Sequence, residues 1–268
     1  MSTGEHSPRF SCSINNLHPH GGARMALHRL IHRLDYSFNE TICDRPGSVI
    51  NIIMKVGGAE RYPEVNDSAP TRNLVADGKA EDGSKWRLQV SPLNMFIVFE
   101  WLAPRRIGNI LKDPDVKASF DILEAIQKHS QIDETTRAGF RVFSYAHLAG
   151  SNVLESTLRR IDPDVVELLT KRAGEIADVG INFDGKTENG LSYSARHGPY
   201  FDKEHKKYFD LLKDEQVSGE ENYNFITDID FAQNNFRIKG QWSYGWCRAL
   251  LDQANNVTEG LMKTGSKK

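Results

Sequence analysis

Histidine and arginine residues are concentrated in one short segment near the N-terminus. His28 and His32 stand four positions apart, and this spacing would place both imidazole rings on one face of a helix, as metal ligation requires. Arg24, Arg29 and Arg33 share that segment, and a nearby guanidinium group disfavours a bound cation. The segment also lacks the glutamate of a His-Glu-x-x-His zinc motif. We therefore expect neither a metal ion nor another cofactor.

The same segment is the strongest candidate for a binding surface. We predict a helix over residues 22–36, because leucine and isoleucine recur on one face at helical spacing. These buried positions are Leu27, Leu30, Ile31 and Leu34. The remaining face would present the basic side chains, which are Arg24, His28, Arg29, His32 and Arg33. Such a basic cluster raises the rate of encounter with an acidic protein surface.

Aromatic residues near the C-terminus form a second candidate contact. We predict a helix over residues 241–262, and Trp242 and Tyr244 lie at its start. Tryptophan and tyrosine are enriched at protein interfaces. Both residues are therefore candidates for binding a partner, ranked after the basic segment.

Two carboxylates offer an arrangement that could be catalytic. Asp228 and Asp230 are two positions apart in an extended segment, so their side chains should point to one side of a strand. Such a pair can hold Mg²⁺ for phosphoryl transfer or nuclease chemistry. The sequence contains no Gly-Ser turn before the pair, no nucleophile motif and no phosphate-binding glycine loop. We therefore assign no catalytic residue and lean against an enzyme.

Composition narrows the class of protein. The chain has 268 residues with a formal net charge of −2. The overall charge therefore gives no electrostatic reason to expect nucleic-acid binding. The longest strongly apolar stretch, Met95 to Phe99, is far shorter than the roughly 20 residues that span a bilayer. The first residues have no apolar signal core, and the 3 cysteines match no disulfide or zinc framework. We expect a cytoplasmic protein without membrane contact.

Two similar turns suggest an internal repeat. Residues 77–86 and 184–193 share the pattern D-G-K-x-E-[DN]-G-x-x-[WY]. Asp-Gly and Asn-Gly supply the positive φ angles that tight hairpins require, so each turn should join two strands. The flanking elements extend the correspondence, because both halves are predicted to follow the order β-α-β-β-β-α.

These patterns predict an α+β fold whose antiparallel sheet or sheets carry helices on one face. A single domain, residues 9–263, would consist of two pseudo-repeats, residues 9–130 and 136–263. We predict disorder for residues 1–8 and 264–268. The apolar segment 49–56 is expected to be an added strand.

Four stretches also resemble a sporadically distributed family of uncharacterised bacterial α+β proteins of similar length. They are Trp86 to Trp101, the predicted helix from Val116 to His129, the strand carrying Arg137-x-Gly139-x-Arg141, and the Asp228-Ile229-Asp230 strand before the last helix. The resemblance implies the same fold class and a bacterial source. It implies no activity and no catalytic residues.

The sequence thus favours a non-enzymatic cytoplasmic protein that binds another protein as an adaptor, regulator or complex subunit. The first alternative is a metal-dependent phosphoryl-transfer or nuclease-like enzyme that uses Asp228 and Asp230. The second is a nucleic-acid or nucleotide binder that uses residues 24–33. We rank both below protein binding.

Overall fold

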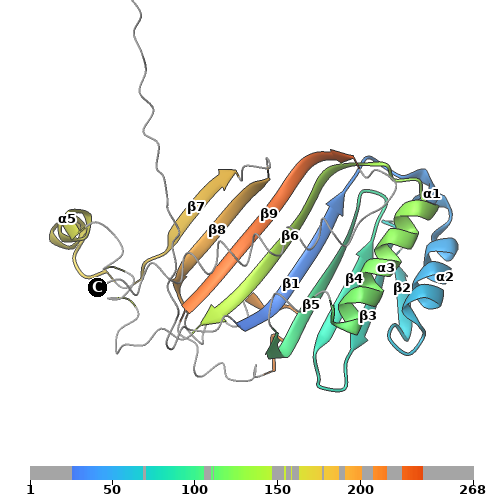
Figure 1. The fold of residues 1–268 in the computed structure, drawn as a ribbon, viewed down its shortest axis with the longest axis horizontal. Coiled ribbons are helices and arrows are strands. Elements are labelled where there is room, and N and C mark those ends of the chain that lie inside the picture. The colour runs from blue at the N-terminus through green and yellow to red at the C-terminus, as the bar shows by residue number, and fades with distance from the viewer. Residues whose placement is uncertain are drawn as a thin grey trace, which may run out of the picture.

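The computed structural model describes residues 26–68, 71–105, 110, 112–146, 154, 158, 163–176, 178–186, 191–200, 208–215 and 225–237. In these residues, nine strands form one antiparallel sheet that carries α-helices (Figure 1). The predicted α+β fold is therefore confirmed. The predicted helix over 241–262 and the terminal segments 1–8 and 264–268 lie outside the described residues.

The sheet has the strand order β2-β3-β4-β5-β1-β6-β9-β8-β7, with β1 at its centre. The first five strands in the sequence are β1 (Ala26–Asp35), β2 (Glu64–Ser68), β3 (Asn73–Lys79), β4 (Lys85–Val90) and β5 (Asn94–Arg105). The remaining four are β6 (Glu134–Ala146), β7 (Ile181–Lys186), β8 (Ser192–Pro199) and β9 (Phe225–Arg237). Both predicted hairpins are confirmed, because β3 pairs with β4 and β7 pairs with β8.

The described helices are α1 (Glu40–Asp44), α2 (Pro46–Gly57), α3 (Pro114–His129) and α5 (Pro163–Ala173). Figure 1 places α2 and α3 together over one face of the sheet, next to β3 and β4. Asp113 caps the start of α3, since its side chain accepts hydrogen bonds from the backbone N–H groups of Asp115 and Val116. Buried side chains of α2, α3 and the sheet form the main core.

The predicted helix over residues 22–36 is wrong, because residues 26–35 form the central strand β1. Leu30, His32 and Leu34 are buried on the helix-covered face, while Arg33 between them is exposed. This is the period of two expected for a strand. A β-bulge between Leu27 and Arg29 breaks the alternation, and so the apolar residues mimic helical spacing.

The predicted extra strand over residues 49–56 is also wrong, because this segment lies within α2. Pro46 occupies the first turn of the helix, where its missing N–H group costs nothing. Val49, Ile53 and Gly57 are buried at intervals of one helical turn. The apolar run is therefore a helix packed against α3.

Both hairpins contain a glycine paired across the strands with a large aromatic residue, which in turn pairs with a phenylalanine. The two rows are Gly78, Trp86 and Phe99 in one half, and Gly185, Tyr193 and Phe231 in the other. A Cβ atom at Gly78 would lie 2.0 Å from Nε1 of Trp86, and one at Gly185 would lie 2.6 Å from Cζ of Tyr193. In each hairpin the ring occupies the space that a glycine leaves.

A second, smaller core lies on the opposite face of the sheet, where the segment 208–215 packs against it. Its buried residues are Phe143, Tyr145, Tyr200, Tyr208, Phe209, Leu212 and Ile226. Glu100 of β5 is fully buried and accepts hydrogen bonds from the backbone N–H groups of residues 210, 211 and 212, at 3.0, 2.7 and 2.8 Å. This carboxylate therefore anchors the segment to the sheet.

Candidate functional site

The alternation of β6 and β9 places charged residues on the sheet face that carries the smaller core. Arg137 and Arg141 alternate in β6 with buried apolar residues of the main core. Asp228 and Asp230 alternate in β9 in the same way. Because the two strands are hydrogen-bonded neighbours, the arginine and aspartate side chains lie side by side.

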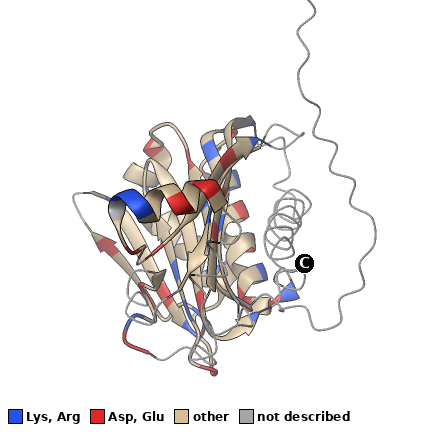
Figure 2. Ribbon diagram, turned by 90° about the vertical axis from the view of Figure 1, so that its left-hand side faces the viewer, with Lys and Arg blue, Asp and Glu red and all other residues tan. Residues whose placement is uncertain are grey.

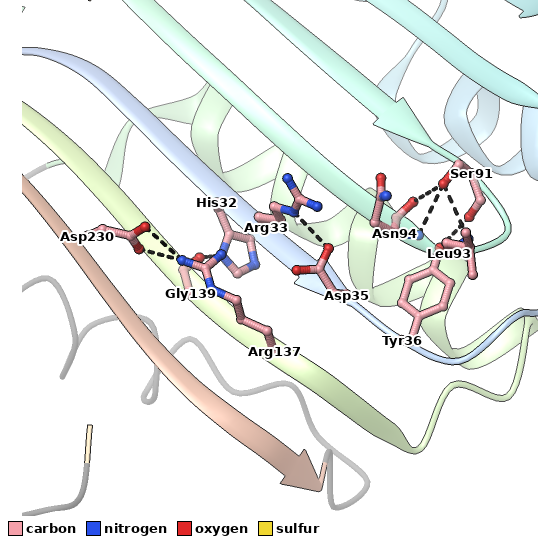
Figure 3. A network of polar contacts seen from close by, with 10 residues as sticks. All are labelled: His32, Arg33, Asp35, Tyr36, Ser91, Leu93, Asn94, Arg137, Gly139 and Asp230. Carbon is pink, nitrogen blue, oxygen red and sulfur yellow. Dashed lines mark hydrogen bonds and ion pairs between the residues drawn. The ribbon is translucent and has the colours of Figure 1, made fainter. Parts of the chain in front are cut away.

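Each arginine forms a two-contact ion pair with one aspartate. Nη2 of Arg137 lies 2.7 Å from both carboxylate oxygens of Asp230 (Figure 3). Nε and Nη2 of Arg141 lie 2.8 and 2.6 Å from the two oxygens of Asp228. These hydrogen bonds with Asp228 are the main cause that raises the pKa of the Arg141 guanidinium above its ordinary value.

The charged row continues onto the central strand. Arg33 of β1 donates a hydrogen bond of 2.7 Å from Nε to Asp35, two residues along the same face (Figure 3). We call Arg33, Arg137 and Arg141 the arginine ladder. In the Arg141 pair the guanidinium lies outermost, since 46% of the Arg141 side chain is exposed but only 11% of Asp228.

The aromatic ring of Phe143 also contacts Arg141 of the ladder. The guanidinium carbon of Arg141 lies 4.8 Å from the centroid of the Phe143 ring, and that of Arg29 lies 5.1 Å from the same centroid. Cation–π contacts of this kind add to the ion pairs. Arg141 is thus held by a carboxylate and by a ring, and it enters any complex with little conformational freedom left to lose.

The structure separates the basic residues that the sequence grouped as a binding face. His28 and His32 are buried on opposite faces, since His28 contacts Tyr145 of the smaller core and His32 stacks on Phe140 of the main core. Their Nδ1 atoms lie 3.0 Å from the carbonyl oxygen of residue 101 and 2.9 Å from that of residue 139. The predicted shared face of a helix is therefore wrong for these two histidines.

Of the arginines predicted to bind, Arg29 is buried and Arg33 is exposed. Nε of Arg29 lies 3.1 Å from Glu100, an ion pair that lacks the geometry of a hydrogen bond, and the guanidinium also contacts Asp210. Arg33 belongs to the arginine ladder. Arg24, Trp242 and Tyr244 lie outside the described residues.

Burial changes the acid–base behaviour of His32. Its ring is enclosed by Phe120 and Phe140, and desolvation lowers its pKa to about 3, although the hydrogen bond with residue 139 acts in the opposite direction. His32 is therefore neutral in the folded protein at physiological pH, and it adds no positive charge to a binding surface.

We expect His32 to make the protein sensitive to acid. Between pH 6.5 and about 3 the unfolded chain binds a proton that the folded chain does not, so stability falls as the pH falls. The contribution of one such group is at most about 1.4 kcal/mol per pH unit. Urea unfolding at a series of pH values should give a shallower decline for His32→Gln than for the wild type. Parallel curves for the two proteins would contradict this assignment.

The predicted orientation of Asp228 and Asp230 agrees with the structure, because both lie on one face of β9. Each is held by an arginine of β6, so a divalent cation would have to displace two guanidinium groups. The described residues contain no group of three or more histidine, cysteine, aspartate or glutamate residues placed to hold a metal ion.

The partners of these aspartates were missed as binding residues in the sequence. Arg137 and Arg141 flank Gly139 in the pattern Arg-x-Gly-x-Arg, which alternates with the same period as Asp-x-Asp. That shared period is a usable signal for a charged cross-strand pair. The sequence does not show the strand register that places the arginines of β6 beside the aspartates of β9.

No protein-family model, curated protein or solved structure matches this chain. Among the described helices, none has the length and apolar character needed to cross a membrane.

Proposed function

We propose that this protein acts by binding another protein, as a non-enzymatic adaptor, regulator or complex subunit in the bacterial cytoplasm. The contact surface would be the arginine ladder, and its partner would be a protein segment that carries carboxylates. The observation that supports this best is the arrangement of Arg141, whose guanidinium is fixed over Phe143 and by Asp228 while nearly half of the side chain stays exposed. Arginine is enriched in binding hot spots.

The geometry leaves the ladder able to bind an acceptor. A guanidinium carries five N–H donors, and Asp228 takes donors on only Nε and Nη2 of Arg141. The remaining donors can bind carboxylate oxygens of a partner. Asp228 and Asp230, which pair with these arginines, also limit the net charge of the surface. This favours a specific protein contact over general attraction to polyanions.

A retention experiment tests this function. The immobilised wild-type chain, the double variant Arg137→Met/Arg141→Met and the control Arg61→Met would be exposed to a lysate of the source organism. Arg61 is a matched control because its ion pair with Asp115 is similarly short, at 2.7 Å, and joins the segment after α2 to the first turn of α3. We expect a partner that the wild type and the control retain and that the double variant loses at least roughly tenfold, a change worth about 1.4 kcal/mol.

Equal retention by all three proteins would move the contact away from the ladder. Retention by the wild type that does not weaken at high salt would also contradict the proposal, because exposed contacts between charges are screened by salt. Circular dichroism of the two variants separates lost binding from lost folding.

No observation favours either of the two alternatives that the sequence offered. The enzyme alternative depends on Asp228 and Asp230, whose carboxylates are engaged by arginines. The nucleic-acid alternative depends on an exposed basic helix over residues 24–33, and residues 26–35 form a strand.

We also propose that the two halves of the chain, residues 9–130 and 136–263, are repeats of one unit. Support comes from the strand orders β1-β5-β4-β3 and β6-β9-β8-β7, which correspond element by element. The matched glycine and aromatic rows add to this support. Superposing the halves of an experimental structure is the test, and different surroundings for Trp86 and Tyr193 would contradict it.

A further inference from the structure

The helix α5 presents an apolar stripe to solvent. It begins at Pro163 and ends before Gly174, whose φ of +86° and N–H bond of 3.1 Å to the carbonyl oxygen of residue 170 terminate the helix. The stripe consists of Val165, Leu168 and Leu169, which are 46%, 49% and 48% exposed. Their spacing of three and four residues places them on one face.

Such a helix needs a packing partner. It has 11 residues, and isolated helices below about 12–15 residues are marginal in water. Most helices in proteins are stabilised by burying an apolar face, and here that face remains in solvent. Three of the exposed large apolar side chains of the described residues therefore lie together on this one helix face.

The charges of α5 indicate which surface fits it. Acidic residues, Asp164 and Glu167, occupy its first half, and basic residues, Lys171 and Arg172, occupy its end. Glu167 and Lys171 form an exposed ion pair within the helix, and Asp164 and Arg172 lie near its two ends. Figure 2 shows α5 in front, with red segments toward one end of the helix and blue at the other. A second α5 in antiparallel orientation would place Asp164 of each copy beside Arg172 of the other, and the helix dipoles would oppose each other favourably.

We propose that α5 is a dimerisation surface whose partner is α5 of a second copy of this chain. The contact is self-complementary, as a twofold interface requires, because each copy contributes the same stripe and the same charge order. The proposal does not depend on the arginine ladder, which lies on the sheet face.

The expected dimer is weak and reversible. Two helices of 11 residues bury less surface than the roughly 1,200 Å² of a standard stable interface. We expect a dissociation constant on the order of 10 µM, which sedimentation velocity can measure between about 1 and 300 µM.

The stripe is tested by Leu168→Asp, with Leu93→Asp as its control. Leu93 is 55% exposed in the turn before β5, so the same substitution is made on a surface leucine remote in sequence from α5. We expect Leu168→Asp to weaken dimerisation at least tenfold, on the order of the cost of leaving a leucine unburied. Leu93→Asp should dimerise like the wild type.

The charge order is tested by mixing two variants. Lys171→Glu/Arg172→Glu makes the helix wholly acidic, and Asp164→Lys/Glu167→Lys makes it wholly basic. Each variant alone should be monomeric across the concentration range, because like charges would then face each other. An equimolar mixture should form a heterodimer, and that recovery could not come from variants that fail to fold.

Three results would overturn the proposal. They are a wild type that remains monomeric at 300 µM, a dimer that Leu168→Asp leaves unchanged, and charge variants whose mixture stays monomeric. Capture of a different protein by the stripe, without self-association, would likewise reject the second copy as its partner.

Discussion

Replacing Gly78 with alanine is expected to lower the free energy of unfolding by about 3 kcal/mol, at the upper end of the cost of overpacking a core. The new Cβ atom would lie 2.0 and 2.1 Å from Nε1 and Cε2 of the Trp86 ring. That ring is 4% exposed and packs against Tyr62 and Phe99, so it has little room to move. Equilibrium unfolding in urea measures the effect.

Alanine substitutions at two further glycines test whether crowding by the new Cβ atom causes the loss of stability. Gly185→Ala should cost less, because Tyr193 is only partly buried and the contact at 2.6 Å is with the end of its ring. Gly47→Ala is the control, since nothing lies within 4 Å of its Cβ position in α2, and alanine there should stabilise by about 0.5–1 kcal/mol. A Gly78→Ala protein as stable as the wild type would show that the Trp86 ring does not fill this space. In a Trp86→Leu background the penalty at Gly78 should shrink.

Glu100→Gln is expected to cost about 3 kcal/mol, in the range for breaking a buried ion pair by removing one charge. The substitution leaves Arg29 without this carboxylate and places an amide N–H group against the backbone N–H groups of residues 210–212. Asp77→Asn removes a carboxylate from the exposed ion pair between Asp77 and Arg87, and it should cost less than about 1 kcal/mol. Urea unfolding of the two variants compares these values directly.

Hydrogen exchange locates the Glu100 effect. If this carboxylate anchors the segment 208–215, amide protection in Glu100→Gln should fall first in that segment and later in the strands. A uniform loss of protection, or equal stabilities for Glu100→Gln and Asp77→Asn, would contradict the anchoring role.

Local signals in the sequence were sufficient where neighbouring residues determine the conformation. Both hairpins were predictable from their sequence pattern, and in the first of them Gly83 supplies a positive φ of 86° in the turn. The Asp-Gly-Lys segments themselves lie inside the strands β3 and β7. The helix α3 was predictable from its apolar spacing. The alternation of Asp228 and Asp230 also gave their common face, since the period of a strand does not depend on its neighbours.

Local signals failed where a segment is surrounded by other elements. In β1 the apolar residues Leu27, Leu30 and Ile31 fit a helix as well as a bulged strand, and the histidines looked polar although both are buried. In α2 a run of apolar residues resembled a strand, and helical periodicity appears only when the buried positions are known. Short apolar runs are ambiguous between the two structures for this reason.

The sequence by itself therefore determined the α+β class, the hairpins and the alternating charges of β6 and β9. Only the tertiary structure decided that Arg141 meets Asp228, that Arg29 is buried against Glu100, and that His32 is neutral. These properties depend on strand register and on desolvation. Both arise from contacts between residues far apart in the chain, and no local pattern encodes them.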